Sequence, residues 1–119
     1  MIDKIITLLR QETPYKYYFN VTPLKDDYSV VYNYNLSSDD GIKQYWRLEL
    51  RIIGKGITEK TLVKIEQIRN KINAAVTTIA DGKLINNIYR CTANGGGSMT
   101  DENSKTVHQF MYYDVLLKK

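Results

Sequence analysis

The sequence predicts an α+β fold, in which a mainly antiparallel sheet has one long and one short helix packed on one face. Three features predict it: segments that alternate between apolar and polar residues, polar connections between these segments, and one long stretch with helical periodicity. The chain has 119 residues, of which 43% are hydrophobic and 25% charged, as in an ordinary globular domain. We therefore expect a single domain over residues 1–119.

The N-terminal segment predicts a short helix that ends near Thr13-Pro14. Its apolar residues recur every three or four positions, as one helical face requires; they are Ile2, Ile5, Ile6 and Leu9. The aromatic stretch Tyr15–Phe19 follows, and its composition fits either a short strand or an ordered arm. Pro23 with Asp26-Asp27 then predicts a turn.

Two alternating segments, Tyr28–Asn35 and Lys43–Ile53, predict a hairpin whose polar loop is Ser37–Gly41. Successive side chains of a strand point to opposite faces of the sheet. In the second strand, the residues expected in the core are Trp46, Leu48, Leu50 and Ile52. The opposite face carries Tyr45, Arg47, Glu49 and Arg51.

The clearest element is a long helix over Lys60–Ile79. Thr58 is a suitable N-cap, and the charge of Glu59 suits the first turn. The apolar residues are spaced three or four apart and form one stripe; they are Leu62, Ile65, Ile68, Ile72, Val76 and Ile79.

After a stop at Asp81-Gly82, the pattern predicts a strand over Lys83–Ala93 and a final strand over Thr106–Leu117. Between them, a polar and glycine-rich stretch reaching Ser104 predicts a long loop. Its first residues are Asn94, Gly95, Gly96, Gly97 and Ser98. We expect this loop to become ordered when it docks on a neighbour, because such a composition resists order unless contacts offset the lost entropy.

The motifs identify no catalytic or metal-binding residues. The lone histidine, His108, has no serine or cysteine nucleophile in a recognisable motif, so we expect a structural or edge-strand role for it. The paired acidic residues lie in predicted turns and lack the spacing of a calcium loop; they are Asp26-Asp27, Asp39-Asp40 and Asp101-Glu102. We therefore predict that the chain is not an enzyme and holds no metal.

Two glycine-rich stretches fail as phosphate-binding loops. Gly54–Glu59 joins a strand to a helix, but Glu59 stands where the dinucleotide fingerprint requires Gly or Ala. Asn94–Ser98 lacks the Gly-Lys-Ser/Thr that completes a P-loop. We therefore predict no cofactor.

The lone cysteine, Cys91, cannot close an internal disulfide, which fits a reducing cytoplasm. The apolar run in Met1–Glu12 is interrupted by charge and is too short to cross a membrane. No small-residue cleavage site follows it. We expect neither a membrane span nor a signal peptide.

The net charge of +4 permits attraction to nucleic acid, but the positive residues are scattered, as on an ordinary solvated surface. Ten tyrosines are unusual for this length, and tyrosine is enriched both in strands and in interfaces. The basic and aromatic run Tyr15–Tyr18 also has the composition of a platform that stacks single-stranded bases. These interpretations remain open.

Four segments carry a resemblance to a known family. They are the strand Asp27–Tyr32 after a turn, the strand Tyr45–Ile53, the helix Thr61–Val76, and the aromatic final strand Phe110–Val115. Together with the short first helix, this layout resembles the tail-terminator, or tail-completion, proteins of long-tailed bacteriophages over nearly the whole chain. The Tyr15–Asp27 segment departs from the pattern, because it is longer and more aromatic than that family's plain connection.

The resemblance implies a structural protein of the virion, located at the neck between tail and head and assembled in the cytoplasm of the bacterial host. Such subunits form a homo-oligomeric ring, typically a hexamer, on the last ring of the major tail-tube protein. The ring stops tube polymerisation and presents a surface to head-completion or connector proteins, while double-stranded DNA passes through its lumen.

Within that hypothesis, the row formed by Tyr45, Arg47, Glu49 and Arg51 contacts a neighbouring subunit or the lumen. Arginine and tyrosine are enriched at interfaces, but charged residues also solubilise the open face of many sheets. Two other functions remain open: another head–tail connector or minor virion protein, and a small nucleic-acid-binding domain.

Overall fold

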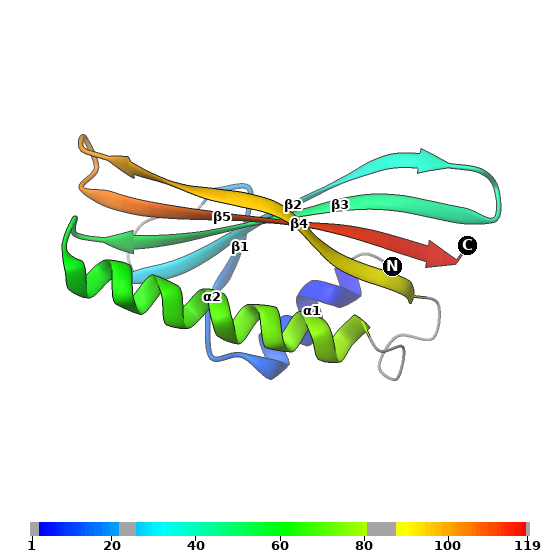
Figure 1. Cartoon of the computed structure of the whole chain (residues 1–119), viewed down its shortest axis with the longest axis horizontal. Coiled ribbons are helices and arrows are strands. Elements are labelled where there is room, and N and C mark those ends of the chain that lie inside the picture. The colour runs from blue at the N-terminus through cyan, green and yellow to red at the C-terminus, as the bar shows by residue number, and fades with distance from the viewer. Residues whose placement is uncertain (1–2, 22–25, 81–87, 119) are drawn as a thin grey trace.

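The computed structural model describes residues 3–21, 26–80 and 88–118. Within these ranges the elements are α1 (Asp3–Glu12), β1 (Tyr17–Phe19), β2 (Tyr28–Asp39), β3 (Lys43–Lys55), α2 (Glu59–Ala80), β4 (Ile88–Asp101) and β5 (Thr106–Lys118). The strands form one sheet in the order β1-β2-β3-β5-β4, and all neighbours are antiparallel except β1 and β2. Both helices lie on the same side of this twisted sheet (Figure 1). The predicted α+β fold is confirmed.

The alternation of side chains along the strands gives the sheet one apolar face, which packs against the helices. Leu48, Leu50 and Ile52 of β3 are buried there, as predicted. Trp46 packs against the same core but is only half-buried. The matching buried row of β5 consists of Val107, Met111, Tyr113, Val115 and Leu117.

Helix α2 supplies the facing half of the core. Thr58 caps it, since the Thr61 backbone N–H donates to Thr58 Oγ1 at 3.2 Å. Its buried residues are Ile65, Ile68, Ile72, Ala75 and Val76. The prediction that Leu62 is in this stripe is wrong: an α-helix turns by about 100° per residue, so Thr61 continues the buried side and Leu62 is 54% exposed. The side chain of Ile79 lies outside the described part.

The aromatic stretch Tyr15–Phe19 contains a strand, β1, which pairs in parallel with β2. Tyr17 is buried, and its hydroxyl lies 2.7 Å from Thr13 Oγ1 at the end of α1. Burial raises the pKa of Tyr17 to about 12, so this phenol stays protonated at neutral pH. Arg10 Nη2 donates to the Tyr17 carbonyl at 3.0 Å. These bonds join α1 to the edge of the sheet.

Two predicted loops are largely strand. The predicted loop Ser37–Gly41 is wrong at its start, because β2 continues through a bulge to Asp39. The predicted loop Asn94–Ser104 is wrong over most of its length, because β4 continues to Asp101. In both cases a neighbouring strand supplies ladder hydrogen bonds that outweigh the low strand propensity of Gly, Ser and Asn.

Residues 81–87 are outside the described ranges. They include the predicted stop at Asp81-Gly82 and the first part of the predicted strand Lys83–Ala93. Among the described residues, no helix has the length and apolar character needed to cross a membrane.

Truncation of the α2 stripe should destabilise the protein. We expect Ile68→Ala or Ile72→Ala to lower the free energy of unfolding by about 2–5 kcal/mol, because each removes fully buried methyl and methylene groups. The matched control Leu62→Ala, on the exposed side of the same helix, should change it by less than about 0.5 kcal/mol. Urea denaturation followed by circular dichroism measures these differences. Losses below about 0.5 kcal/mol at both isoleucines would remove α2 from the core.

Candidate functional site

The row predicted on β3 lies on the sheet face turned away from the helices. Leu48 and Leu50 alternate with the residues of the row and are buried on the helix side. The side chains of the row therefore point to the opposite face. Tyr45 and Arg47 are exposed, whereas Glu49 and Arg51 are half-buried. Because β3 is the middle strand of the sheet, the row runs along the centre of the open face.

Two aromatic rings of β5 support the arginines of this row. The register places Phe110 opposite Arg51 and Tyr112 opposite Glu49. Arg47 Cζ lies 4.4 Å from the centre of the Tyr112 ring, and Arg51 Cζ lies 5.7 Å from that of Phe110. Such contacts are worth about 0.5–1 kcal/mol at exposed sites. A guanidinium stacked on a ring keeps the N–H groups at its edge available to an acceptor.

The Arg51 end of the row contains two buried nitrogen atoms, Arg51 Nε and His108 Nδ1, that have no hydrogen-bond partner among the described residues. The other ring nitrogen of His108 lies 2.8 Å from Thr106 Oγ1. Burial, and then the charge of Arg51, lower the pKa of His108, so the ring is neutral at pH 7. A buried donor without an acceptor costs about 1–3 kcal/mol. An acceptor brought by a partner would therefore bind favourably at Arg51.

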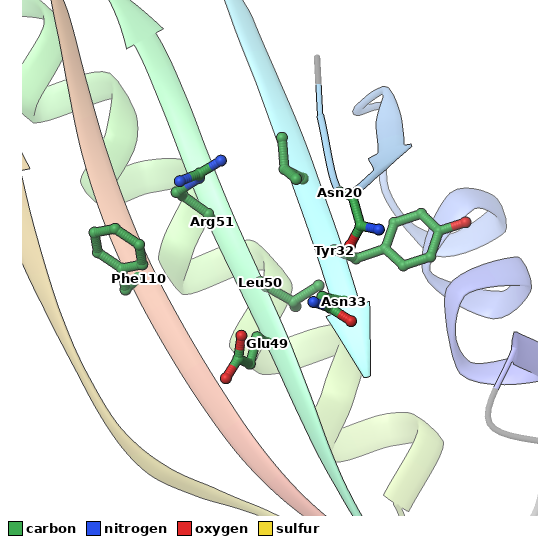
Figure 2. Close-up of a pocket in the computed structure, with 8 residues that line it drawn as sticks. Asn20, Tyr32, Asn33, Glu49, Leu50, Arg51 and Phe110 are labelled. Atoms are coloured by element: carbon green, nitrogen blue, oxygen red, sulfur yellow. The ribbon is translucent and has the colours of Figure 1, made fainter. Parts of the chain in front are cut away.

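A cleft of about 200 Å³ opens beside Arg51 (Figure 2). Its lining residues are Asn20, Val31, Tyr32, Asn33, Glu49, Leu50, Arg51 and Phe110. Figure 2 shows Arg51 and Phe110 on neighbouring strands, with Asn20 reaching toward Tyr32 from the segment after β1. The cleft thus combines a guanidinium, a carboxylate and two carboxamides with apolar walls. This chemistry suits a protein surface of mixed polarity better than a polyanion.

The second predicted site, Asn94–Ser98, lies in β4 and not in a loop. A bulge between Ala93 and Gly96 interrupts its pairing with β5. Asn94 Nδ2 donates to Asp114 Oδ2 at 2.7 Å, and Gln109 Nε2 donates to the Gly97 carbonyl at 2.9 Å. Backbone and side-chain bonds therefore hold this segment, and its predicted role in docking stays a prediction.

The sheet brings the two predicted sites together. Gly97 pairs with Phe110, and Phe110 pairs with Arg51, so the three residues form a line across β4, β5 and β3. Arg47 likewise pairs with Asp114, which accepts the hydrogen bond from Asn94. The open face is thus one continuous surface that extends from the central strand to the edge strand.

The aromatic and basic run Tyr15–Tyr18 makes several contacts within the subunit. Tyr17 is buried in the core, and the Tyr18 hydroxyl donates to Asp26 Oδ2 at 2.7 Å. Lys16 Nζ lies 3.1 Å from the other oxygen of the same carboxylate. This arrangement gives the run a structural role, and base stacking on its rings stays a prediction.

The paired acidic residues have roles in turns. Asp40 Oδ1 accepts from the backbone N–H groups of Ile42 and Lys43, and Asp101 Oδ1 accepts from those of Asn103 and Ser104. In the part of the chain that the structure describes, no group of three or more His, Cys, Asp or Glu side chains is arranged to hold a metal ion.

The sequence reasoning missed the contribution of β5 to this site. His108, Phe110 and Tyr112 alternate with the buried residues of the final strand, so the alternation could have placed them on the open face. His108 is also not on an edge strand, because β5 lies between β3 and β4. The register that aligns the rings with Arg47 and Arg51 has no local signature in the sequence.

No protein-family model matches the sequence, and a search of curated protein sequences finds no match. Among solved structures, the chain is similar to one in the virion of a native gene transfer agent (GTA) particle. The TM-score is 0.54 at 11% sequence identity, and the alignment covers 97% of this chain and 84% of that chain. At this identity the likeness is one of fold, and it extends over the whole domain.

The β4 bulge brings Gly96 close to the backbone of β5. A Cβ added at Gly96 would lie 2.5 Å from the Phe110 carbonyl oxygen, whereas one added at Gly97 would meet nothing within 4 Å. We expect Gly96→Ala to lower the free energy of unfolding by about 1–3 kcal/mol and Gly97→Ala to change it by less than about 0.5 kcal/mol. Chemical denaturation of the two variants compares them directly, and equal effects would contradict the close approach of β4 to β5.

Proposed function

We propose that this chain is a structural virion protein that caps a phage tail tube as a ring, stops tube polymerisation and forms the joint to the head. The ring is a homo-oligomer, and we propose six subunits. Its partners are the major tail-tube protein on one side and a head-completion or connector protein on the other. The ring is assembled in the host cytoplasm, and double-stranded DNA passes through its lumen.

The observation that carries the proposal is the fold similarity to a chain of the GTA virion, which extends over 97% of this chain. A likeness that covers nearly the whole chain, and not one supersecondary motif, supports a related role in a virion. The layout of elements supports the same role independently, because it resembles the tail-terminator family.

The open sheet face supports an assembly function. A sheet with both helices on one side leaves the other side available to neighbours, and here that side carries arginines stacked on aromatic rings. Arginine and aromatic residues are enriched in the cores of protein interfaces. We propose that the row of Tyr45, Arg47, Glu49 and Arg51 contacts a neighbouring subunit or faces the lumen.

The same fold similarity also supports a second candidate function, that of another head–tail connector or minor virion protein. The location of the subunit in the particle separates the two. A tail terminator lies on the last ring of the tail tube, whereas a connector lies on the head side of the joint.

Purified protein at high concentration should form rings with a central hole in negative-stain or cryo-electron images. Rings are expected because each subunit of a cyclic assembly carries two different patches. One patch binds the other patch of the next subunit until the ring closes. Images that contain monomers alone, at concentrations where virion proteins assemble, would contradict the ring.

Charge reversal on the open face should prevent assembly without unfolding the chain. We expect Arg47→Glu with Arg51→Glu to retain the circular dichroism spectrum of the native protein but to yield no full-length infectious tails. Lys4→Glu with Lys71→Glu changes the net charge equally at exposed positions on the two helices and is the matched control. If the arginine variant assembles as the control does, the row only solubilises the sheet.

A further inference from the structure

The two ends of the molecule carry different exposed surfaces. At one end, the turn of the β2–β3 hairpin exposes Ile42. At the other end, where β3 passes into α2, the exposed apolar residues are Ile57, Leu62 and Val63. Figure 1 shows the hairpin turn and the start of α2 at opposite ends of the long axis.

The hairpin tip, which we define as Asp39–Lys43, is a hydrogen-bonded turn that presents one apolar side chain. Asp39 Oδ1 accepts from the Gly41 backbone N–H at 2.9 Å, and Asp40 Oδ1 accepts from those of Ile42 and Lys43 at 2.9 and 2.7 Å. Ile42 is nevertheless 67% exposed between these carboxylates and Lys43. Because these bonds hold the backbone of the turn in place, the backbone loses little entropy when Ile42 binds.

The α2 groove, which we define as Tyr28, Lys60, Val63, Lys64 and Gln67, has the complementary character. It is a cleft of about 380 Å³ in which Val63 and the Tyr28 ring are the apolar part. Lys60 and Lys64 contribute two positive charges, and the N-terminal turns of α2 add the positive end of the helix dipole. Glu59 begins the helix but does not line the groove.

These surfaces cannot meet within one molecule. The 13 residues of β3 separate them. Helix α2 runs back along the sheet, but the groove residues lie in its first few turns. At about 3.3 Å per strand residue and about 1.5 Å per helix residue, the tip and the groove are on the order of 30 Å apart. Contact between them requires two copies of the chain.

We propose that the hairpin tip of one copy docks in the α2 groove of the next, with Ile42 against Val63 and Tyr28, and with Asp39 and Asp40 facing Lys60 and Lys64. This contact rests on the proposed function, because it is the interface through which neighbouring subunits would close the ring. The tip carries two carboxylates and one lysine, a net charge of −1, whereas the groove carries the two positive charges of Lys60 and Lys64. Unlike net charges therefore favour the head-to-tail arrangement, which generates a ring or a filament and not a symmetric dimer.

Variants of either surface should weaken self-association in the full-length protein. We expect Ile42→Ser, and separately Lys60→Glu with Lys64→Glu, to raise the apparent Kd for self-association at least about tenfold, the loss typical of an interface hot spot. Analytical ultracentrifugation measures it, and circular dichroism checks folding. The control variant, Lys71→Glu with Lys4→Glu, changes the net charge by the same amount but outside the groove. It should associate like the native chain.

Cysteine cross-linking tests the geometry. Ile42→Cys protein mixed with Val63→Cys protein should form disulfide-linked heterodimers, and a chain with both substitutions should form a ladder of multimers. Ile42→Cys mixed with Lys71→Cys, about two turns further along α2, is the matched control and should not cross-link. Burial raises the pKa of the native Cys91 thiol to about 12, which lowers its reactivity, and the native chain without either substitution is the control for cross-links through Cys91.

The outcomes separate this contact from the proposed function. Filaments that carry the Ile42-to-Val63 cross-link would support the contact and contradict the ring. Rings without this cross-link would support the proposed function and overturn the contact. Cross-linking of Ile42→Cys protein with itself, or absence of self-association at high concentration, would also overturn the contact.

Discussion

The rest of the structure depends on the packing of the α2 stripe against the inner face of β3 and β5. A close approach is at Gly54, where an added Cβ would lie 2.8 Å from Thr61 Cγ2 and 3.0 Å from Ile65 Cδ1. The absence of a side chain at Gly54 therefore lets the first turns of α2 lie directly on the strand. Ile68 and Ile72 continue this contact, and α1 adds Ile5, Ile6 and Leu9 to the same core. The buried apolar residues of both helices thus lie on one side of the sheet.

A consequence is that, within the described residues, the other side of the sheet has no second layer. Its side chains stabilise one another across the strands, by arginine–aromatic stacking and by the hydrogen bond from Asn94 to Asp114. This packing is incomplete at Arg51 and His108, where buried nitrogen atoms have no partner among the described residues. Incomplete satisfaction is tolerable at a surface that a partner covers, since the partner can supply the acceptor.

The proportions of the molecule follow from the long strands. β2 to β5 have 12 to 14 residues each, and the chain measures 46 × 24 × 23 Å. Hairpin turns therefore project at both ends, with different chemistry at each. An elongated subunit with unlike ends favours heterologous contacts, which is the geometry that assembly into closed rings requires.

The sequence by itself determined the elements whose signal is local. Periodicity identified α2 through Ile65, Ile68 and Ile72, and alternation in β3 assigned Leu48 to the core and Arg47 to the open face. Both patterns follow from backbone geometry that repeats within a few residues. The row on β3, one half of the candidate site, could be predicted for this reason.

Only the tertiary structure decided the features that depend on a distant partner. Asn94–Ser98 is a strand because β5 supplies its hydrogen bonds, although its own composition favours a loop. Tyr17–Phe19 is a strand because β2 lies beside it. The stacking of Arg47 on Tyr112 depends on a register between segments some sixty residues apart in the chain, which no local pattern encodes.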